Sequence, residues 1–169
     1  MRSTTLAKTA AAAFVAAALG GLASRPAKSG WYEGLKKPDF QPPRQAFPIV
    51  WPILYTDIAV VSASTIDTFN DRGDAEKARA YTRALAVNLV LNASWSWIFF
   101  NRRRLGTSAI VAAALTASSA DLARRAAAAN AGAAAVLVPY PLWCGFATAL
   151  STRIWQLNRQ HDHPAFIRS

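Results

Sequence analysis

The chain has 169 residues, of which 53% are hydrophobic and only 17% are charged, and its formal net charge is +10. An ordinary soluble domain of this length carries more charge, so the composition points first to a membrane protein. The Lys and Arg residues lie between the apolar runs instead of lining one amphipathic face, which is typical of membrane proteins and argues against nucleic-acid binding. The single cysteine, Cys144, lies inside an apolar run and can form no internal disulfide.

Five charge-poor runs predict a single all-α membrane domain with a bundle of five transmembrane helices, since a hydrocarbon core of roughly 30 Å needs about 20 helical residues. The expected helices cover about residues 5–24, 46–69, 80–100, 105–124 and 132–157. The first run also resembles a cleaved signal peptide, because a basic residue precedes it and small residues end it. Small residues at every fourth position favour a retained, closely packed helix instead: Ala12, Ala16 and Gly20, and next to them Ala13, Ala17 and Gly21.

Residues 25–45 form a long connector for a compact bundle, and long ordered loops tend to carry function. Pro38, Pro42 and Pro43 favour extended, stiff backbone in this connector. In the last helix, Pro139 and Pro141 leave carbonyl groups without partners, so a kink is expected there.

An odd number of spans places the two termini on opposite sides of the membrane. The amino-terminal tail and the second and fourth connectors together hold eight Lys and Arg residues, whereas the first and third connectors and the carboxyl tail hold eleven. Because basic residues concentrate on the cytoplasmic side, this count favours a cytoplasmic carboxyl terminus and a cytoplasmic first loop.

Motifs for several chemistries are missing from the sequence. It has no Gly-rich phosphate loop, no nucleophile elbow, no CxxC and no HExxH. Its only histidines, His161 and His163, lie in the carboxyl tail without a third or fourth ligand nearby. An exposed polar tail is therefore expected there instead of a metal site, and neither a metal nor an obligatory cofactor is predicted.

Three of the expected helices each carry a tryptophan on a stripe of residues spaced three or four apart. The stripes are Phe47, Trp51, Leu54 and Tyr55 in the second helix, Asn88, Asn92, Trp95 and Phe99 in the third, and Tyr140, Trp143 and Ala147 in the fifth. Membrane interfaces also favour Trp and Tyr, so such stripes can be packing alone. Asn92 favours an inward direction, because an amide within the membrane is costly unless it is hydrogen-bonded.

An apolar cavity walled by aromatic rings, with one amide and a few phenols, suits a large, flat and mostly apolar ligand such as a porphyrin or a sterol. Asp57 is a carboxylate deep in an apolar segment and is therefore a functional candidate. It lies about 120° around its helix from Trp51, so it need not face the same cavity. A partner on another helix or at the interface is favoured over ligand contact.

Four segments in this order resemble the TspO/MBR family, the translocator proteins also described as peripheral benzodiazepine receptors and tryptophan-rich sensory proteins: "WYEGLKKPDFQPP", "FPIVWPILY", "LNASWSWIFF" and "VPYPLWCGFATAL". The match covers residues 31–157. The resemblance implies a five-helix bundle, usually dimeric, with the first loop as a lid over a cavity. In the family this cavity binds porphyrins, haem-type tetrapyrroles, cholesterol and isoquinoline or benzodiazepine ligands.

The resemblance also implies roles for individual residues. It places the lid aromatics at Trp31 and Tyr32, the loop prolines at Pro38, Pro42 and Pro43, and the cavity residues at Trp51, Asn92, Trp95, Tyr140 and Trp143. Some bacterial members promote light- and oxygen-dependent porphyrin oxidation, and the resemblance implies Trp51 and Trp143 as the residues for it.

The sequence departs from the family pattern in two places. Asp39 and Phe40 stand where relatives often carry tryptophan, which weakens stacking at the lid. In the sterol-recognition pattern Trp155, between Leu150 and Arg159, takes the place of tyrosine, so sterol specificity is not supported.

The sequence thus predicts an integral membrane binding protein for porphyrin or haem-type tetrapyrroles, with a sensory, regulatory or transport role. An enzyme that degrades porphyrin in the light is one alternative, and a sterol or small-lipid transporter is another. The expected partners are the lipid bilayer, the tetrapyrrole, a sterol or isoquinoline-type ligand, and a second copy of the chain in a homodimer. The predicted binding residues are Trp31, Tyr32, Pro42, Pro43, Phe47, Trp51, Tyr55, Asn92, Trp95, Tyr140, Trp143 and Ala147.

Overall fold

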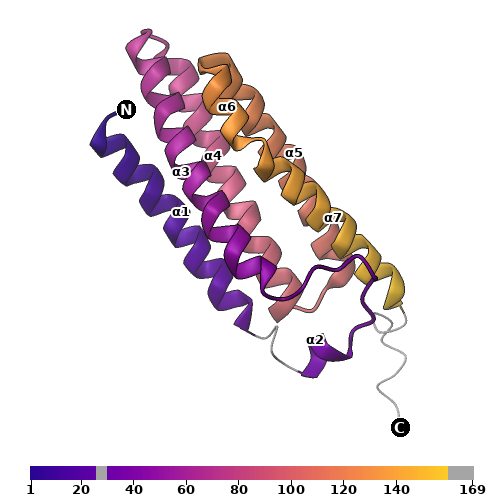
Figure 1. The fold of residues 1–169 in the computed structure, drawn as a ribbon. Coiled ribbons are helices and arrows are strands. Elements are labelled where there is room, and N and C mark those ends of the chain that lie inside the picture. The colour runs from indigo at the N-terminus through magenta and orange to yellow at the C-terminus, as the bar shows by residue number, and fades with distance from the viewer. Residues whose placement is uncertain (26–29, 160–169) are drawn as a thin grey trace.

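A computed structural model describes residues 1–25 and 30–159. Long helices pack side by side into a bundle, and the described residues contain no β-strand (Figure 1). The helices are α1 (Ser3–Ala23), α2 (Gly30–Gly34), α3 (Ala46–Asp71), α4 (Ala75–Ser96), α5 (Leu105–Ala129), α6 (Ala131–Leu137) and α7 (Pro139–Leu157). A π-helical turn, Trp97–Asn101, extends α4. The predicted all-α bundle of five long helices is confirmed, with α6 and α7 together forming the fifth.

Four segments are long and apolar enough to cross a membrane: α1, α3, α5 and the stretch Ala131–Leu157. The remaining long helix, α4, begins at Ala75, five residues before the expected start. Its first three turns are charged, and it buries two amides further on, which lowers its apolarity. The charged residues are Glu76, Lys77, Arg79 and Arg83.

The expected boundary near residue 124 was too early, because α5 continues to Ala129. Its last turns are rich in alanine, and Arg125 donates to Asp121 one turn earlier at 2.5 Å. Asn130 then ends α5 in an extended conformation, and its side chain accepts from the Ala133 N–H at 3.1 Å, which caps α6. A single residue, Val138, separates α6 from α7 where the two prolines predicted a kink.

Helix α1 packs along α3 and α4 through small residues (Figure 1). The buried positions are Ala13, Ala16 and Gly20, so the contact face combines members of both expected small-residue stripes. Thr9 lies on the same face and donates to the carbonyl oxygen of Ala59 at 2.8 Å. Small side chains allow the backbones to approach closely, and this hydrogen bond uses that proximity.

Polar contacts hold both ends of α1. At its start, the buried carboxylate of Asp67 accepts from Thr5 Oγ1 at 2.7 Å and from the Arg2 backbone N–H. At its end, Asn101 Nδ2 donates to the Ala23 carbonyl at 2.9 Å. These contacts fix the position of α1 along the bundle, and with it the wall that α1 contributes to the site.

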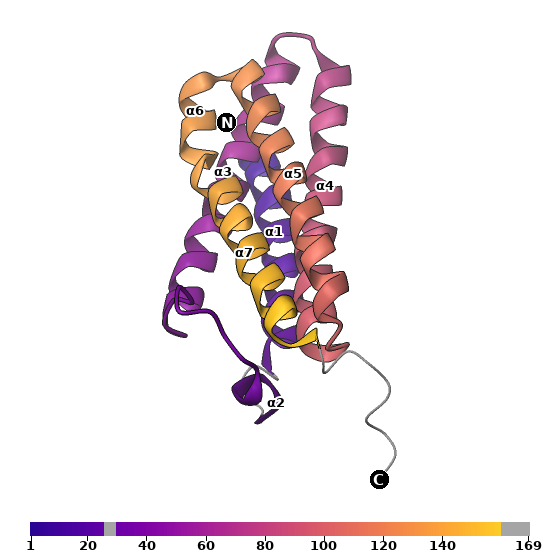
Figure 2. The ribbon, with the colours of Figure 1, turned by 90° about the vertical axis from the view of Figure 1, so that its right-hand side faces the viewer.

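Helix α5 lies beside both α4 and α7 (Figure 2). Ala109, Ala113 and Ala117 stand four residues apart, a spacing that predicts one close-packing face, but Ala113 and Ala117 are exposed. The contact with α7 instead uses Thr116, which shares a 2.9 Å hydrogen bond with Thr148. Helix α5 therefore contacts α7 through the face that carries its paired hydroxyl, not through the face that alanine spacing predicted.

Candidate ligand-binding site

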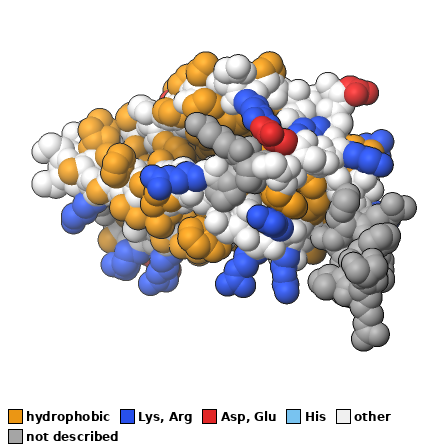
Figure 3. Space-filling view, turned by 90° about the horizontal axis from the view of Figure 1, so that it is seen from below, with side chains coloured by type: hydrophobic (Ala, Val, Ile, Leu, Met, Phe, Trp, Pro, Cys, Tyr) orange, Lys and Arg blue, Asp and Glu red, His pale blue; other side chains and the backbone are white. Residues whose placement is uncertain are grey.

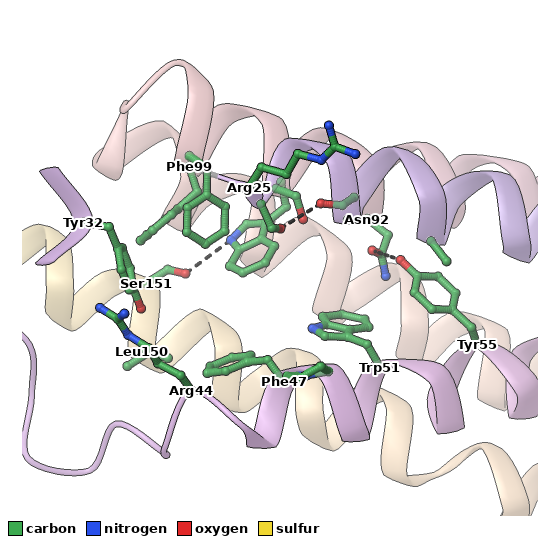
Figure 4. Close-up of a pocket in the computed structure, with 18 of the residues that line it drawn as sticks. Arg25, Tyr32, Arg44, Phe47, Trp51, Tyr55, Asn92, Phe99, Leu150 and Ser151 are labelled. Atoms are coloured by element: carbon green, nitrogen blue, oxygen red, sulfur yellow. Dashed lines mark hydrogen bonds between the residues drawn. The ribbon is translucent and has the colours of Figure 1, made fainter. Parts of the chain in front are cut away.

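A cavity of about 710 Å³ lies at the lid end of the bundle. Its walls come from α1, α3, α4 and α7, and Tyr32 of α2 lies at its lid side while Tyr55 lies at its deep end (Figure 4). Seven of the lining residues are aromatic: Tyr32, Phe47, Trp51, Tyr55, Trp95, Phe99 and Phe100. This size and lining are typical of a site for a small organic ligand.

Hydrogen bonds at the deep end form a chain across four helices. The Tyr55 hydroxyl donates to Asn92 Oδ1 at 2.8 Å, and Asn92 Nδ2 donates to the Tyr140 oxygen at 3.1 Å. Tyr140 donates to Asn88 Oδ1 at 2.7 Å, and Asn88 Nδ2 donates to Ser118 Oγ at 3.2 Å. The chain explains how two amides are accommodated in an apolar bundle. It also fixes the polar groups that a ligand would meet.

The two cavity tryptophans belong to aromatic pairs on neighbouring helices. On α3, the ring centroids of Trp51 and Tyr55 are 5.6 Å apart, and on α4 those of Trp95 and Phe99 are 5.8 Å apart. Trp95 Nε1 donates to Ser151 Oγ of α7 at 3.3 Å, which fixes its indole. Such rings present flat π-surfaces with few hydrogen-bonding groups.

The lid residues pack on the π-helical end of α4. The Tyr32 ring lies 6.2 Å from Phe99 and 5.6 Å from Phe100, and the Trp31 ring lies 6.3 Å from Phe99. The Arg103 guanidinium lies 5.2 Å from the Trp31 ring in a cation–π contact. Burial raises the pKa of the Tyr32 phenol further above neutral, and the protonated hydroxyl can donate a hydrogen bond.

A buried amide joins the lid to the end of α7. The Lys36 N–H donates to Asn158 Oδ1 at 3.0 Å, and Asn158 Nδ2 donates back to the Lys36 carbonyl at 2.8 Å. Asn158 is only 1% exposed, so the two bonds are protected from water. Sequence reasoning missed this residue, because an asparagine after the last apolar turn resembles an ordinary helix end.

We expect Asn158→Ala to loosen the lid while the bundle stays folded. The substitution leaves the N–H and C=O of Lys36 without their partner, at a cost of about 1–3 kcal/mol that falls on the lid alone. Amide exchange over residues 30–45 should accelerate, measured by hydrogen–deuterium exchange mass spectrometry. Gln156→Ala is the matched control, since Gln156 is exposed and, in the described part of the chain, its side chain hydrogen-bonds with Arg153 alone. Equal exchange in the two variants would exclude Asn158 as the lid anchor.

Half of the predicted binding residues line the cavity: Tyr32, Phe47, Trp51, Tyr55, Asn92 and Trp95. The other half lie outside its lining: Trp31, Pro42, Pro43, Tyr140, Trp143 and Ala147. Tyr140 is fully buried and reaches the site through Asn92. Trp143 packs against Phe47 with ring centroids 5.8 Å apart, and its Nε1 is buried with no hydrogen-bond partner among the described residues. Asp57 is half-buried and lies outside the cavity lining.

Sequence reasoning missed the contributions of α1 and of the π-helical turn. Helix α1 provides small residues, such as Gly20 and Gly21, whose identity carries no chemical signal. Phe99 and Phe100 both line the cavity from the π-helical turn at the end of α4. Such turns are frequent at functional sites.

Metal ligands do not gather in the part of the chain that the structure describes. No group of three or more His, Cys, Asp or Glu residues there could hold an ion. The predictions for His161 and His163 fall outside the described residues.

A family model for the TspO/MBR family matches residues 9–156. The chain belongs to the TspO/MBR family. Its relatives include the uncharacterized membrane protein YtaB of Bacillus subtilis, 32% identical over 79% of this chain and 83% of that protein. Protein CrtK of Rhodobacter capsulatus is 30% identical over 86% of this chain and 89% of its own length. The translocator protein of Ovis aries is 30% identical over 76% of this chain and 75% of its own. Family membership and the apolar helices together make this an integral, multi-pass membrane protein.

Proposed function

We propose that this membrane protein binds porphyrin or haem-type tetrapyrroles in the cavity beneath the lid, and acts in sensing, regulation or transport of the ligand. The observation that carries the proposal is the wall of seven aromatic residues around about 710 Å³. Flat macrocycles gain most from such walls, because they stack over a large area and need few hydrogen bonds.

The charges at the opening support the same ligand class. Arg25 and Arg44 line the lid side of the cavity, and no Asp or Glu is among its described lining residues. Arg44 pairs with the exposed Glu33 of the lid at 3.2 Å, so a ligand carboxylate would share or replace this contact. Natural porphyrins carry acidic side chains on one edge of an apolar ring. A ligand of this kind can place its ring against Trp51 and Trp95 with its carboxylates towards the two guanidinium groups.

Titration with protoporphyrin in the dark tests the proposal. Saturable quenching of tryptophan fluorescence with a matching change in porphyrin absorbance is expected, because Trp51 and Trp95 line the cavity. A competing apolar ligand of similar size without carboxylates should bind more weakly. Quenching that rises linearly without saturation, and that survives loss of the cavity tryptophans, would show partition into the detergent instead of binding.

Light-dependent porphyrin oxidation is the second candidate function. It is favoured by Trp51, whose oxidisable indole lies on the cavity wall beside Tyr55. Trp143, the other implied residue, lies behind Phe47. Illumination of the complex in air should then yield a new absorbing product, and Trp51→Phe should abolish the product while dark binding survives. If the wild-type protein forms no product in the light, porphyrin oxidation is excluded and binding remains as the function.

Orientation, assembly and transport follow as further proposals. We place the lid end in the cytoplasm, and Lys and Arg side chains are distributed around that end (Figure 3). Accessibility of a cysteine introduced at the exposed Phe40, in place of the buried native Cys144, reports which side the lid faces.

A homodimer is proposed from the family resemblance. Ligand flux across reconstituted vesicles would separate a transporter, including one for sterols or small lipids, from a binding protein.

A further inference from the structure

A second hollow, of about 360 Å³, opens at the end of the bundle away from the lid. Its lining residues come from the last turns of α3 and the first turns of α4. The hairpin that joins these two helices lies at the opposite end of the bundle from α2 (Figure 1). Arg79, Thr82 and Arg83 of α4 line the hollow together with Asn70 of α3, and Ile66 contributes an apolar surface. The hollow therefore combines two cations and an amide in one place, while the Thr82 hydroxyl donates to the Ala78 carbonyl oxygen at 2.9 Å.

Most other cations at this end already have a partner in the protein. Lys77 pairs with Asp74, Arg2 with Asp67 and Asp71, Arg124 and Arg125 with Asp121, and Arg72 donates to the Ala128 carbonyl. Arg79 and Arg83, in contrast, have no acidic group within 4.0 Å among the described residues. They stand four residues apart on one helix, where like charges repel. An anion between them would remove this repulsion.

The position of the hollow along α4 places it at the level of lipid headgroups. Helix α4 has 22 residues and its π-helical extension five, so together they extend roughly 40 Å at 1.5 Å per residue. This exceeds the roughly 30 Å of a hydrocarbon core. Because the charged residues are all in the first turns of α4, the excess length lies at that end, in the headgroup layer.

The residues that follow on the same stripe of α4 are apolar and exposed. Val87 is four residues beyond Arg83 and 58% exposed, and Val90 is 65% exposed. A spacing of three or four residues puts them on one face with Arg79 and Arg83. This face is thus basic at the headgroup level and apolar below it, which matches a phospholipid and not a free anion.

We propose that the hollow binds the phosphate of an anionic phospholipid. Arg79 and Arg83 contact the phosphate oxygens, Asn70 hydrogen-bonds to the headgroup, and an acyl chain follows Val87 and Val90. Guanidinium groups suit this role, because they match phosphate oxygens with two parallel hydrogen bonds. The site is separate from the aromatic cavity and does not depend on the proposed tetrapyrrole function.

Native mass spectrometry of the full chain in detergent tests the site. Phosphatidylglycerol should bind in preference to phosphatidylcholine, and Arg79→Gln with Arg83→Gln should weaken phosphatidylglycerol binding roughly tenfold. Arg102→Gln with Arg104→Gln is the matched control, since it removes the same charge from exposed residues at the lid end. Circular dichroism checks that both variants are folded.

Two results would overturn the proposal. If the control pair weakens phosphatidylglycerol binding as much as the Arg79 and Arg83 pair, the effect is general surface charge. If millimolar inorganic phosphate displaces the lipid completely from the wild-type protein, the hollow is a site for free phosphate. Retention of the lipid under phosphate, together with a loss confined to the Arg79 and Arg83 variant, supports the lipid site.

Discussion

Asn92→Leu is expected to lower the free energy of unfolding by about 2 kcal/mol, although leucine has nearly the same volume as asparagine. Asn92 accepts from Tyr55 at 2.8 Å and donates to the fully buried Tyr140 at 3.1 Å. Leucine does neither, so two phenol oxygens each lose a partner, and the one at the fully buried Tyr140 is out of reach of water. Unfolding in mixed micelles, followed by helical circular dichroism, measures the loss.

A double-mutant cycle with Tyr55→Phe identifies the cause. In the wild-type protein Tyr55→Phe leaves Asn92 Oδ1 without its donor, so it should cost about 1 kcal/mol. In the Asn92→Leu background the bond is already lost, and the same change should cost almost nothing. Additive costs would mean that Asn92 stabilises the bundle by some route other than this chain of hydrogen bonds.

Trp51→Leu is expected to weaken protoporphyrin binding by at least tenfold. The indole of Trp51 lines the cavity and pairs with Tyr55 at 5.6 Å between centroids, so its loss removes a stacking surface worth roughly 2 kcal/mol. Porphyrin absorbance is the appropriate signal, because the substitution also removes one of the fluorescent residues. Tyr140 is not touched, so the hydrogen-bond chain should stay intact.

Trp97→Leu provides the matched control for this prediction. Trp97 undergoes the same change of side chain but is 49% exposed and is not part of the cavity lining. Its affinity for protoporphyrin should equal that of the wild-type protein. If both substitutions weaken protoporphyrin binding equally, the binding site is not this cavity. Trp143→Leu would then be the next variant to measure.

The expected and observed sites agree on which residues share a helix face, and they differ on which of these faces line the cavity. Spacing along one helix correctly grouped Trp51 with Tyr55 and Asn92 with Trp95, because residues three or four apart share a helix face. The same spacing grouped Tyr140 with Trp143 and Ala147, none of which lines the cavity. A helix face buried in a bundle can look towards the cavity or towards a neighbouring helix, and the spacing is identical in both cases.

By itself the sequence determined that this is a membrane-embedded bundle of long helices with an aromatic interior and a long first connector. These properties follow from hydropathy, helix length and proline content, all of which act locally. Only the tertiary structure decided that α1 lines the cavity with glycine, that Phe99 and Phe100 of the π-helical turn both line it, and that Asn158 holds the lid. Each of these depends on contacts between residues far apart in the chain, and the physical reason is that close packing and buried hydrogen bonds are properties of pairs of surfaces.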